Sequence, residues 1–94
     1  MQTDMKIEII HNPDQATLDQ YGCGSWPIWE KEISRFPWTY DAKEVCLVLE
    51  GEVTVTPQNG DAVIIRAGDL VTFPEGMSCE WNVTKPIRKH YNFY

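Results

Sequence analysis

Side chains that could do chemistry gather in two short stretches of the chain. In the first stretch, Trp38 and Tyr40 stand two residues apart and Glu44 follows four residues after Tyr40. In the second stretch, Cys79 and Trp81 are also two residues apart. Because residues i and i+2 share one face of a strand, each pair can project from the same face. A carboxyl group, a phenol and a thiol in one site could transfer protons, and the indoles could stack against a flat ligand.

A cationic partner for these groups could come from the strand expected at 87–94. Lys89 and His90 are adjacent there, and only one of them can face the same interior, because consecutive strand residues point in opposite directions. The alternate set is the more apolar one and would carry Lys89 inward; its members are Ile87, Lys89, Tyr91 and Phe93. The other register would carry His90 inward. Either residue could bind a substrate.

The elements that must position these residues have the pattern of strands. From Trp26 onward, short apolar runs alternate with Gly, Pro, Asn and Asp at intervals of roughly eight to twelve residues, which is typical of an all-β sandwich or barrel. The 94 residues suffice for one domain with a modest core. We therefore expect residues 26–94 to form a single β-barrel domain and residues 1–25 to be an amino-terminal segment that packs on it.

The first half of the chain gives three local predictions. Residues 12–19 could form one or two helical turns, with Asn12 as the cap. The run 44–49 is predicted to be a strand that ends in a chain reversal at Glu50-Gly51. Residues 52–56 alternate cleanly between polar and apolar, which predicts a second strand.

The second half gives two further predictions. Asn59-Gly60 supplies two residues that tolerate positive φ, which predicts a type I′ hairpin turn with 62–66 as the returning strand. Lys85-Pro86 is predicted to separate a strand at 79–83 from a final strand at 87–94.

Composition excludes several classes of function. The formal net charge of −6 opposes nucleic-acid binding, which requires clustered basic residues. No stretch approaches the roughly 18 apolar residues of a membrane span or resembles a signal peptide, so we expect a cytoplasmic protein. The three cysteines match no zinc-binding spacing and are expected to be reduced thiols.

The spacing around Cys79 resembles the second motif of the cupin superfamily. Gly68, Pro74, Gly76 and Cys79 follow the pattern G-x5-P-x-G-x2-C. In metal-binding cupins this pattern continues with a histidine ligand and, four residues later, an asparagine. Here Cys79 stands at the histidine position and Val83 at the asparagine position.

The first cupin motif, G-x5-H-x-H-x3,4-E-x6-G, aligns with the first stretch at every spacing. Trp38 and Tyr40 replace the two histidines, Glu44 and Gly51 are retained, and Glu32 replaces the opening glycine. Within the superfamily, the chain looks related to small single-domain cupins such as ureidoglycine aminohydrolases and ethanolamine-utilisation cupins. The sequence segments on which this likeness rests are WPIWEKE, VLEGEVTVTP, GDLVTFPEG and PIRKHY.

This resemblance implies a cupin jelly-roll barrel, often dimeric, with a site in the barrel mouth. It directs Glu44 into the barrel as the leading candidate for proton transfer, with Tyr40 or Cys79 assisting; the alternative is an exposed carboxylate at a strand edge. Trp38 and Trp81, with Tyr40, would either line a cavity or simply plug the barrel. Cys79 could equally be a small buried hydrophobe.

The resemblance leaves the chemistry open between three readings. Trp38 has no lone pair for a metal, so we expect no metal ion and no other cofactor. The first reading is therefore a small-molecule-binding protein that acts as a metal-independent isomerase, epimerase or hydrolase. The second is a binding or sensory module without turnover. The third is a metal-dependent cupin with atypical ligands, namely Glu44, Tyr40 and Cys79.

The run 45–49 also predicts self-association. If Glu44, Cys46 and Val48 face the barrel interior, alternate residues form an apolar stripe outside, composed of Val45, Leu47 and Leu49. The strand expected at 6–10 could cover that stripe only in part. We therefore expect a two-fold homodimer with the stripe at its interface.

Overall fold

The structure is a computed structural model that describes residues 6–94. Strands dominate the described chain: β1 (Glu8–His11), β2 (Ile28–Lys31), β3 (Ser34–Thr39), β4 (Glu44–Pro57), β5 (Val63–Arg66), β6 (Asp69–Phe73) and β7 (Ser78–Phe93). Helix α1 (Gln15–Tyr21) and the short 3-10 helix η1 (Cys23–Ser25) lie between β1 and β2. Within residues 6–94, no helix has the length and hydrophobicity needed to cross a membrane.

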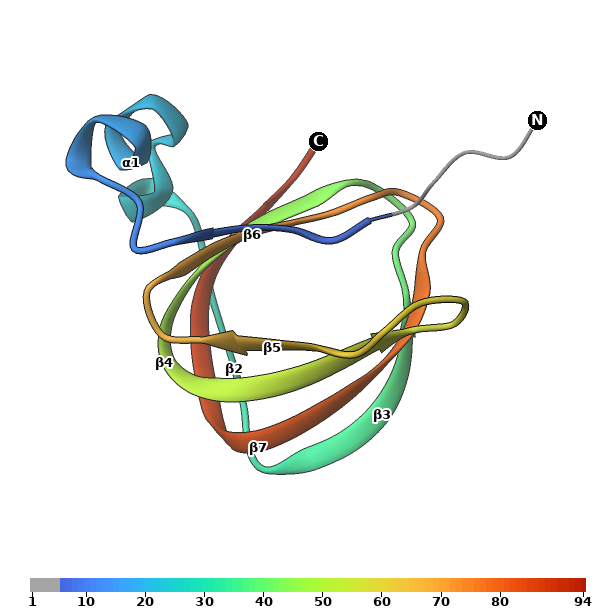
Figure 1. The fold of residues 1–94 in the computed structure, drawn as a ribbon. Coiled ribbons are helices and arrows are strands. Elements are labelled where there is room, and N and C mark those ends of the chain that lie inside the picture. Colours follow the sequence, from blue (N-terminus) through green and yellow to red (C-terminus); the bar gives the residue numbers. More distant parts are fainter. Residues whose placement is uncertain (1–5) are drawn as a thin grey trace.

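The strands form one antiparallel sheet that curls into a barrel, with α1 outside it (Figure 1). The order is β1-β6-β4-β7-β2, and the long strands β4 and β7 each have two partners along one edge. Strand β4 pairs first with β6 and then with β5, while β7 pairs first with β3 and then with β2. The predicted all-β barrel in a single domain is thereby confirmed.

Strand β4 continues through Glu50-Gly51 without reversing its direction, so the predicted chain reversal is wrong. Gly51 has a φ of 95°, and the pairing of β4 with β7 shifts register between Val48 and Val53. A Cβ at Gly51 would lie 2.1 Å from the carbonyl oxygen of Pro86. The glycine therefore bends the strand where β7 approaches closely, rather than ending it.

The predicted break at Lys85-Pro86 is also wrong, because β7 is continuous from Ser78 to Phe93. Pro86 lies opposite the irregular region of β4, where Glu52 pairs with Lys85 and Glu50 with Arg88. A proline has no N–H for the ladder, and an irregularity in the pairing is where a sheet tolerates it.

The hairpin between β4 and β5 is present, but its turn is not type I′. Neither Asn59 nor Gly60 has a positive φ, whereas type I′ requires it at both central residues. Pairing between the two strands ends at Val55 and Val63, while β4 runs on to pair with β7 as far as Pro57. The connection is therefore longer than two residues and needs no left-handed conformation.

The helix cap is Asp14 rather than Asn12. The side chain of Asp14 accepts a hydrogen bond from the backbone N–H of Thr17 at 2.9 Å. Asn12 instead adopts a φ of 49°, and its N–H donates to the carbonyl oxygen of Gly68. The residue before a proline is disfavoured in helical conformation, so the helix begins after Pro13.

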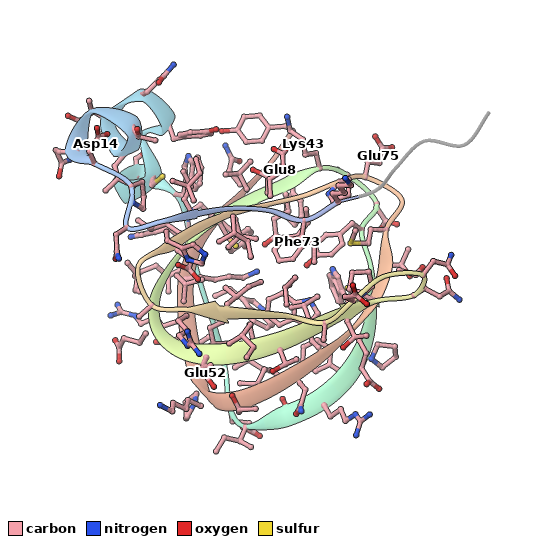
Figure 2. All side chains as sticks on the ribbon, in the orientation of Figure 1. Glu8, Asp14, Lys43, Glu52, Phe73 and Glu75 are labelled. Atoms are coloured by element: carbon pink, nitrogen blue, oxygen red, sulfur yellow. The ribbon has the colours of Figure 1, made fainter. Side chains whose placement is uncertain are left out.

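Alternation along β4 divides the apolar residues into two clusters. Cys46 and Val48 belong to the barrel interior, which is filled around Phe73 (Figure 2), while exposed Asp14 and Glu75 project outward. Val45 packs outside the barrel in a second cluster with Cys23, Trp26 and Leu70; Leu18 and Leu47 lie against it. The residues around α1 and η1 therefore cover part of the predicted outer stripe.

Candidate functional site

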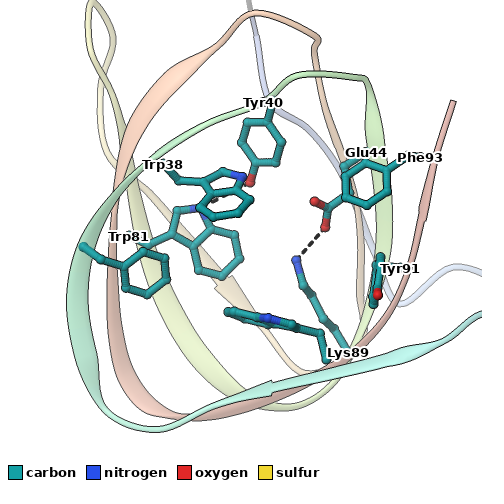
Figure 3. Close-up of a pocket in the computed structure, with 9 residues that line it drawn as sticks. Trp38, Tyr40, Glu44, Trp81, Lys89, Tyr91 and Phe93 are labelled. Atoms are coloured by element: carbon teal, nitrogen blue, oxygen red, sulfur yellow. Dashed lines mark hydrogen bonds and ion pairs between the residues drawn. The ribbon is translucent and has the colours of Figure 1, made fainter.

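One end of the barrel holds a cavity of about 230 Å³. Seven of its nine lining residues are aromatic, namely Trp29, Phe36, Trp38, Tyr40, Trp81, Tyr91 and Phe93, and the other two are Glu44 and Lys89 (Figure 3). Trp38 and Phe93 are about half exposed and form part of the mouth. The structure therefore brings four of the predicted site residues together in one open cavity, namely Trp38, Tyr40, Glu44 and Trp81.

Glu44 and Lys89 form an ion pair inside this aromatic wall. Lys89 Nζ donates to Glu44 Oε2 at 2.5 Å, and the two side chains are only 6% and 5% exposed. The same Nζ lies 5.0 Å from the ring centre of Trp29 and 4.7 Å from that of Trp81. A carboxylate and two indole faces are the surroundings that suit an ammonium ion.

Several hydrogen-bonding positions of these groups remain available to a ligand. Glu44 Oε1 has no hydrogen-bond partner in the part of the chain that the structure describes, and Lys89 uses one of its three N–H bonds. The side chains of Tyr40, Glu44 and Lys89 all point towards the centre of the cavity (Figure 3). The floor therefore offers one carboxylate oxygen as acceptor and an ammonium as donor.

Tyr40 is a neutral hydrogen-bonding group rather than a base or nucleophile. Its ring stacks on Phe73 with 4.7 Å between ring centres, and Tyr40 Oη accepts a hydrogen bond from Trp81 Nε1 at 3.2 Å. Burial raises the pKa of Tyr40 well above its ordinary value, and the negative charge of Glu44 raises that pKa further. The phenol therefore keeps its proton and can donate it in a hydrogen bond.

Cys79 does not line the cavity. It is 7% exposed and belongs to the barrel core, where burial raises the pKa of its thiol to about 11. Its pairing partner Trp38 and its neighbour Trp81 reach the cavity instead, because their indoles are far longer than a thiol. The geometry supports the reading of Cys79 as a small buried hydrophobe.

The choice between Lys89 and His90 is decided by the pairing of β7. Lys89 faces the cavity, as the more apolar alternate set indicated, and His90 faces away from it. His90 Nδ1 lies 2.9 Å from the carbonyl oxygen of Trp26, outside the cavity wall. The structure therefore does not bring His90 to the site.

Sequence reasoning missed two residues of the wall, Trp29 and Phe36. Strand β2 places Trp29 opposite Lys89, and β3 places Phe36 opposite Trp81. Tyr91 and Phe93 also line the cavity. They belong to the alternate set that the sequence placed on the inner face together with Lys89.

The residues at the cupin ligand positions do not fit a transition metal. Trp38 offers no lone pair, and Cys79 lies in the barrel core rather than in the cavity wall. Glu44 already faces the ammonium of Lys89. Among residues 6–94, no three or more His, Cys, Asp or Glu residues are grouped as a metal site would need. No catalytic step is therefore assigned to a metal.

Comparison with known proteins gives one family and several relatives. The family model described as EutQ-like cupin domain matches residues 18–91. The crystal structure of a DUF861 family protein from Thermotoga maritima is similar with a TM-score of 0.87 and 48% identity, over 97% of this chain and 100% of that chain.

Two curated relatives are named acetate kinase EutQ. The Escherichia coli K12 protein is 38% identical over 67% of this chain, and the Salmonella typhimurium LT2 protein is 39% identical over 60% of it. These matches cover 26% and 24% of the relatives. The chain thus spans about a quarter of the length of the curated relatives that it matches.

Proposed function

The chain belongs to the EutQ-like cupin domain family, and from this premise we propose that it binds a small organic molecule in the barrel cavity and transfers a proton through Glu44. The observation that carries the proposal is the Glu44–Lys89 pair, the two charged side chains in a wall of seven aromatic residues. A concave, largely apolar cavity with a few converging polar groups is the usual form of a ligand site.

The burial of this pair favours a functional role. Removing two charges from water costs free energy that their mutual attraction often fails to recover. A buried ion pair therefore adds little to the stability of the fold by itself. A carboxylate that projects into a ligand-sized cavity is a candidate general base, because it can reach the proton of a bound ligand. Glu44 Oε1 is available to accept a proton, which supports an isomerase, epimerase or hydrolase that works without a metal.

The acetate kinase activity in the name of the curated relatives is not proposed for this chain. Phosphoryl transfer is catalysed by positioning phosphates with several cationic groups and metal ions. The cavity wall offers Lys89 as its cation, and this cation already faces a carboxylate. The acetate kinase name belongs to proteins about four times as long as the matched segment.

A second candidate is a binding module without turnover. It is favoured by the ion pair itself, since Glu44 and Lys89 can hold a polar ligand by hydrogen bonds without any transfer of a proton. The two candidates agree on the cavity as the binding site and differ only in whether Glu44 accepts a proton.

The test is a binding screen that uses the fluorescence of the indoles in the cavity wall. Wild type and Glu44→Gln are titrated with small ketones, carboxylic acids, alcohols and amines. We expect at least one class to bind wild type and to bind Glu44→Gln at least about tenfold more weakly, a loss of about 1.4 kcal/mol.

The matched control is Glu50→Gln, an exposed position on the same strand, which should bind as wild type does. Circular dichroism checks that each variant is folded. If folded Glu44→Gln binds the ligand as tightly as wild type, Glu44 has a structural role only.

A further inference from the structure

We infer that Lys89 is a second catalytic residue and that the substrate is a small, uncharged carbonyl compound whose oxygen binds Lys89 Nζ while Glu44 removes a proton from the adjacent carbon. This inference rests on the proposed function and specifies its substrate class and reaction.

Lys89 is held as a cation aimed at the cavity. The edge of Glu44 and the faces of Trp29 and Trp81 surround its Nζ atom, at 2.5 Å from the carboxylate oxygen and about 5 Å from each ring centre. Two N–H bonds remain for a ligand oxygen. An ammonium fixed in this way needs no reorganisation when negative charge develops beside it.

Charge balance selects an uncharged ligand. The pair contributes one negative and one positive charge to a wall that is otherwise aromatic. A ligand with a net charge would leave that charge uncompensated in an apolar cavity, at a large desolvation cost. An uncharged ligand keeps the site neutral before and after proton transfer.

The net charge of the site also stays constant during the reaction. Glu44 Oε1 takes the proton as the C–H bond next to the carbonyl breaks. The electron pair of that bond forms a C=C bond, and the carbonyl π electrons move onto the oxygen. The negative charge has then passed from Glu44 to the enolate oxygen, and both positions adjoin the ammonium of Lys89. Return of a proton from Glu44 to carbon regenerates the carbonyl compound.

Tyr40 supplies a second donor for the same oxygen. Its phenol is neutral, and Tyr40 Oη already accepts a hydrogen bond from Trp81 Nε1. Its own hydrogen finds no acceptor among residues 6–94 and so is available to the ligand. A carbonyl oxygen accepts two hydrogen bonds, which matches one donor from Lys89 and one from Tyr40.

The size of the cavity limits the substrate to roughly ten heavy atoms. Its volume is about 230 Å³, whereas a water molecule occupies about 30 Å³ of the liquid. Aromatic walls favour a flat or apolar tail beside the carbonyl group. Hydroxyacetone, dihydroxyacetone and phenylacetone are suitable probes, and the alcohols made by reducing each carbonyl are their matched controls.

The experiment measures exchange of the hydrogen next to the carbonyl for deuterium in D2O by proton NMR. Wild type should exchange at least one ketone faster than buffer does, and Glu44→Gln should lose this activity. Lys89→Met should slow the exchange by about 10²- to 10³-fold, the usual effect of removing one oxyanion donor. Lys85→Met, an exposed lysine on the same strand, is the matched control and should exchange as wild type does.

A double variant keeps the test valid if Lys89→Met does not fold, since that variant leaves Glu44 buried without its counterion. Glu44→Gln with Lys89→Met removes both charges. By indole fluorescence, wild type should bind each ketone at least about tenfold more tightly than its alcohol, which corresponds to about 1.4 kcal/mol. The double variant should bind ketone and alcohol alike, and an unchanged preference would overturn the inference.

The outcomes separate this inference from the proposed function. If exchange is lost in Glu44→Gln but unchanged in folded Lys89→Met, proton transfer by Glu44 stands and the role of Lys89 is overturned. If wild type catalyses no exchange and binds alcohols as tightly as ketones, the carbonyl substrate is overturned while the cavity remains a binding site. If no compound of any class in the screen binds, the proposed function itself fails.

Discussion

The two charged side chains of the cavity wall, Glu44 and Lys89, lie 45 residues apart in the sequence. Each charge makes the burial of the other possible. A lone buried charge at either position would lose its hydration with no opposite charge to compensate for the cost. The neighbouring phenol of Tyr40 is neutral because burial raises its pKa, so the charges of the cavity wall are those of the pair.

Removing one charge of the pair should destabilise the fold more than removing both. Lys89→Met should lower the free energy of unfolding by about 3–5 kcal/mol, because Glu44 is left buried without a partner. Adding Glu44→Gln should recover most of that loss. Urea denaturation measures both, and Lys85→Met is the exposed control. A loss for Lys89→Met no larger than that of the control would contradict the buried pair.

Alkaline pH should destabilise the protein through its buried thiols. Folding raises the pKa of Cys79 from 9.0 to about 11 and the pKa of Cys46 from 9.0 to about 12, in both cases chiefly by burial. The folded state therefore holds these protons more tightly than the unfolded state. Stability should be unaffected by these groups below about pH 9 and should fall as the pH rises from 9 towards 12.

Urea denaturation at a series of pH values between 8 and about 11 measures this effect. Cys79→Ala with Cys46→Ala should be less stable at pH 8 but should lose less stability on going to high pH. An equal loss in wild type and in this variant would show that other groups, such as the buried phenol of Tyr40, cause it.

At the level of elements, the site depends on how β4 and β7 bend together. Their pairing is regular from Glu44 to Val48 and again from Val53 to Pro57, with the irregular region between. The first half of β4 carries Glu44, and the matching half of β7 carries Lys89. The bend at Gly51 closes the barrel and so brings these halves into one cavity wall with β2 and β3.

Gly51 should therefore be far more sensitive to substitution than Gly60. In Gly51→Ala, the new Cβ meets the backbone of Pro86 at 2.1 Å while φ is 95°. Backbone strain and overpacking together should cost about 2–6 kcal/mol. Gly60→Ala meets Pro57 Cβ at 3.4 Å, an ordinary contact, and should change stability by about 1 kcal/mol or less.

Thermal denaturation of the two glycine variants gives the comparison directly. A marked loss in Gly60→Ala would mean that this residue needs the left-handed conformation of a type I′ turn after all. Equal melting temperatures for Gly51→Ala and wild type would mean that the approach of β7 is looser than the structure shows.

At the scale of the whole molecule, the apolar residues exceed what the barrel interior holds. Cys23 and Trp26 cover Val45 outside the barrel, and Leu47 is only partly buried. Exposed apolar side chains remain elsewhere on the surface, including Ile10, Ile28 and Ile64. Leu18 of α1 and Cys23 of η1 are therefore part of the covering layer.

Homodimerisation stays a prediction, with the partly buried edge of the stripe at Leu47 and Leu49 as the proposed contact. Sedimentation at micromolar concentration should give about twice the mass of the 10.9 kDa chain, and Leu47→Glu should reduce it towards one chain. The exposed substitution Ile33→Glu is a control that should leave the mass unchanged. A monomer at every concentration would show that Cys23 and Trp26 suffice as cover.

The sequence by itself determined the fold and the candidate carboxylate. The spacing of turn residues and the two cupin motifs predicted the barrel, and alternation placed Cys46, Val48 and Lys89 on its inner face. These features depend on local geometry, since a strand repeats every two residues whatever it pairs with. Local pattern was misleading at Gly51 and Pro86, because a bend and a break have the same residue signature.

Only the tertiary structure decided how the site is assembled. The pairing of Glu44 with Lys89, and the places of Trp29 and Phe36 in the wall, depend on registers between strands that are distant in the sequence. The same registers send His90 outward and leave Cys79 in the barrel core, outside the cavity wall. Register is fixed by the packing of all the strands at once, and a shift of one residue would turn every side chain of a strand to the opposite face.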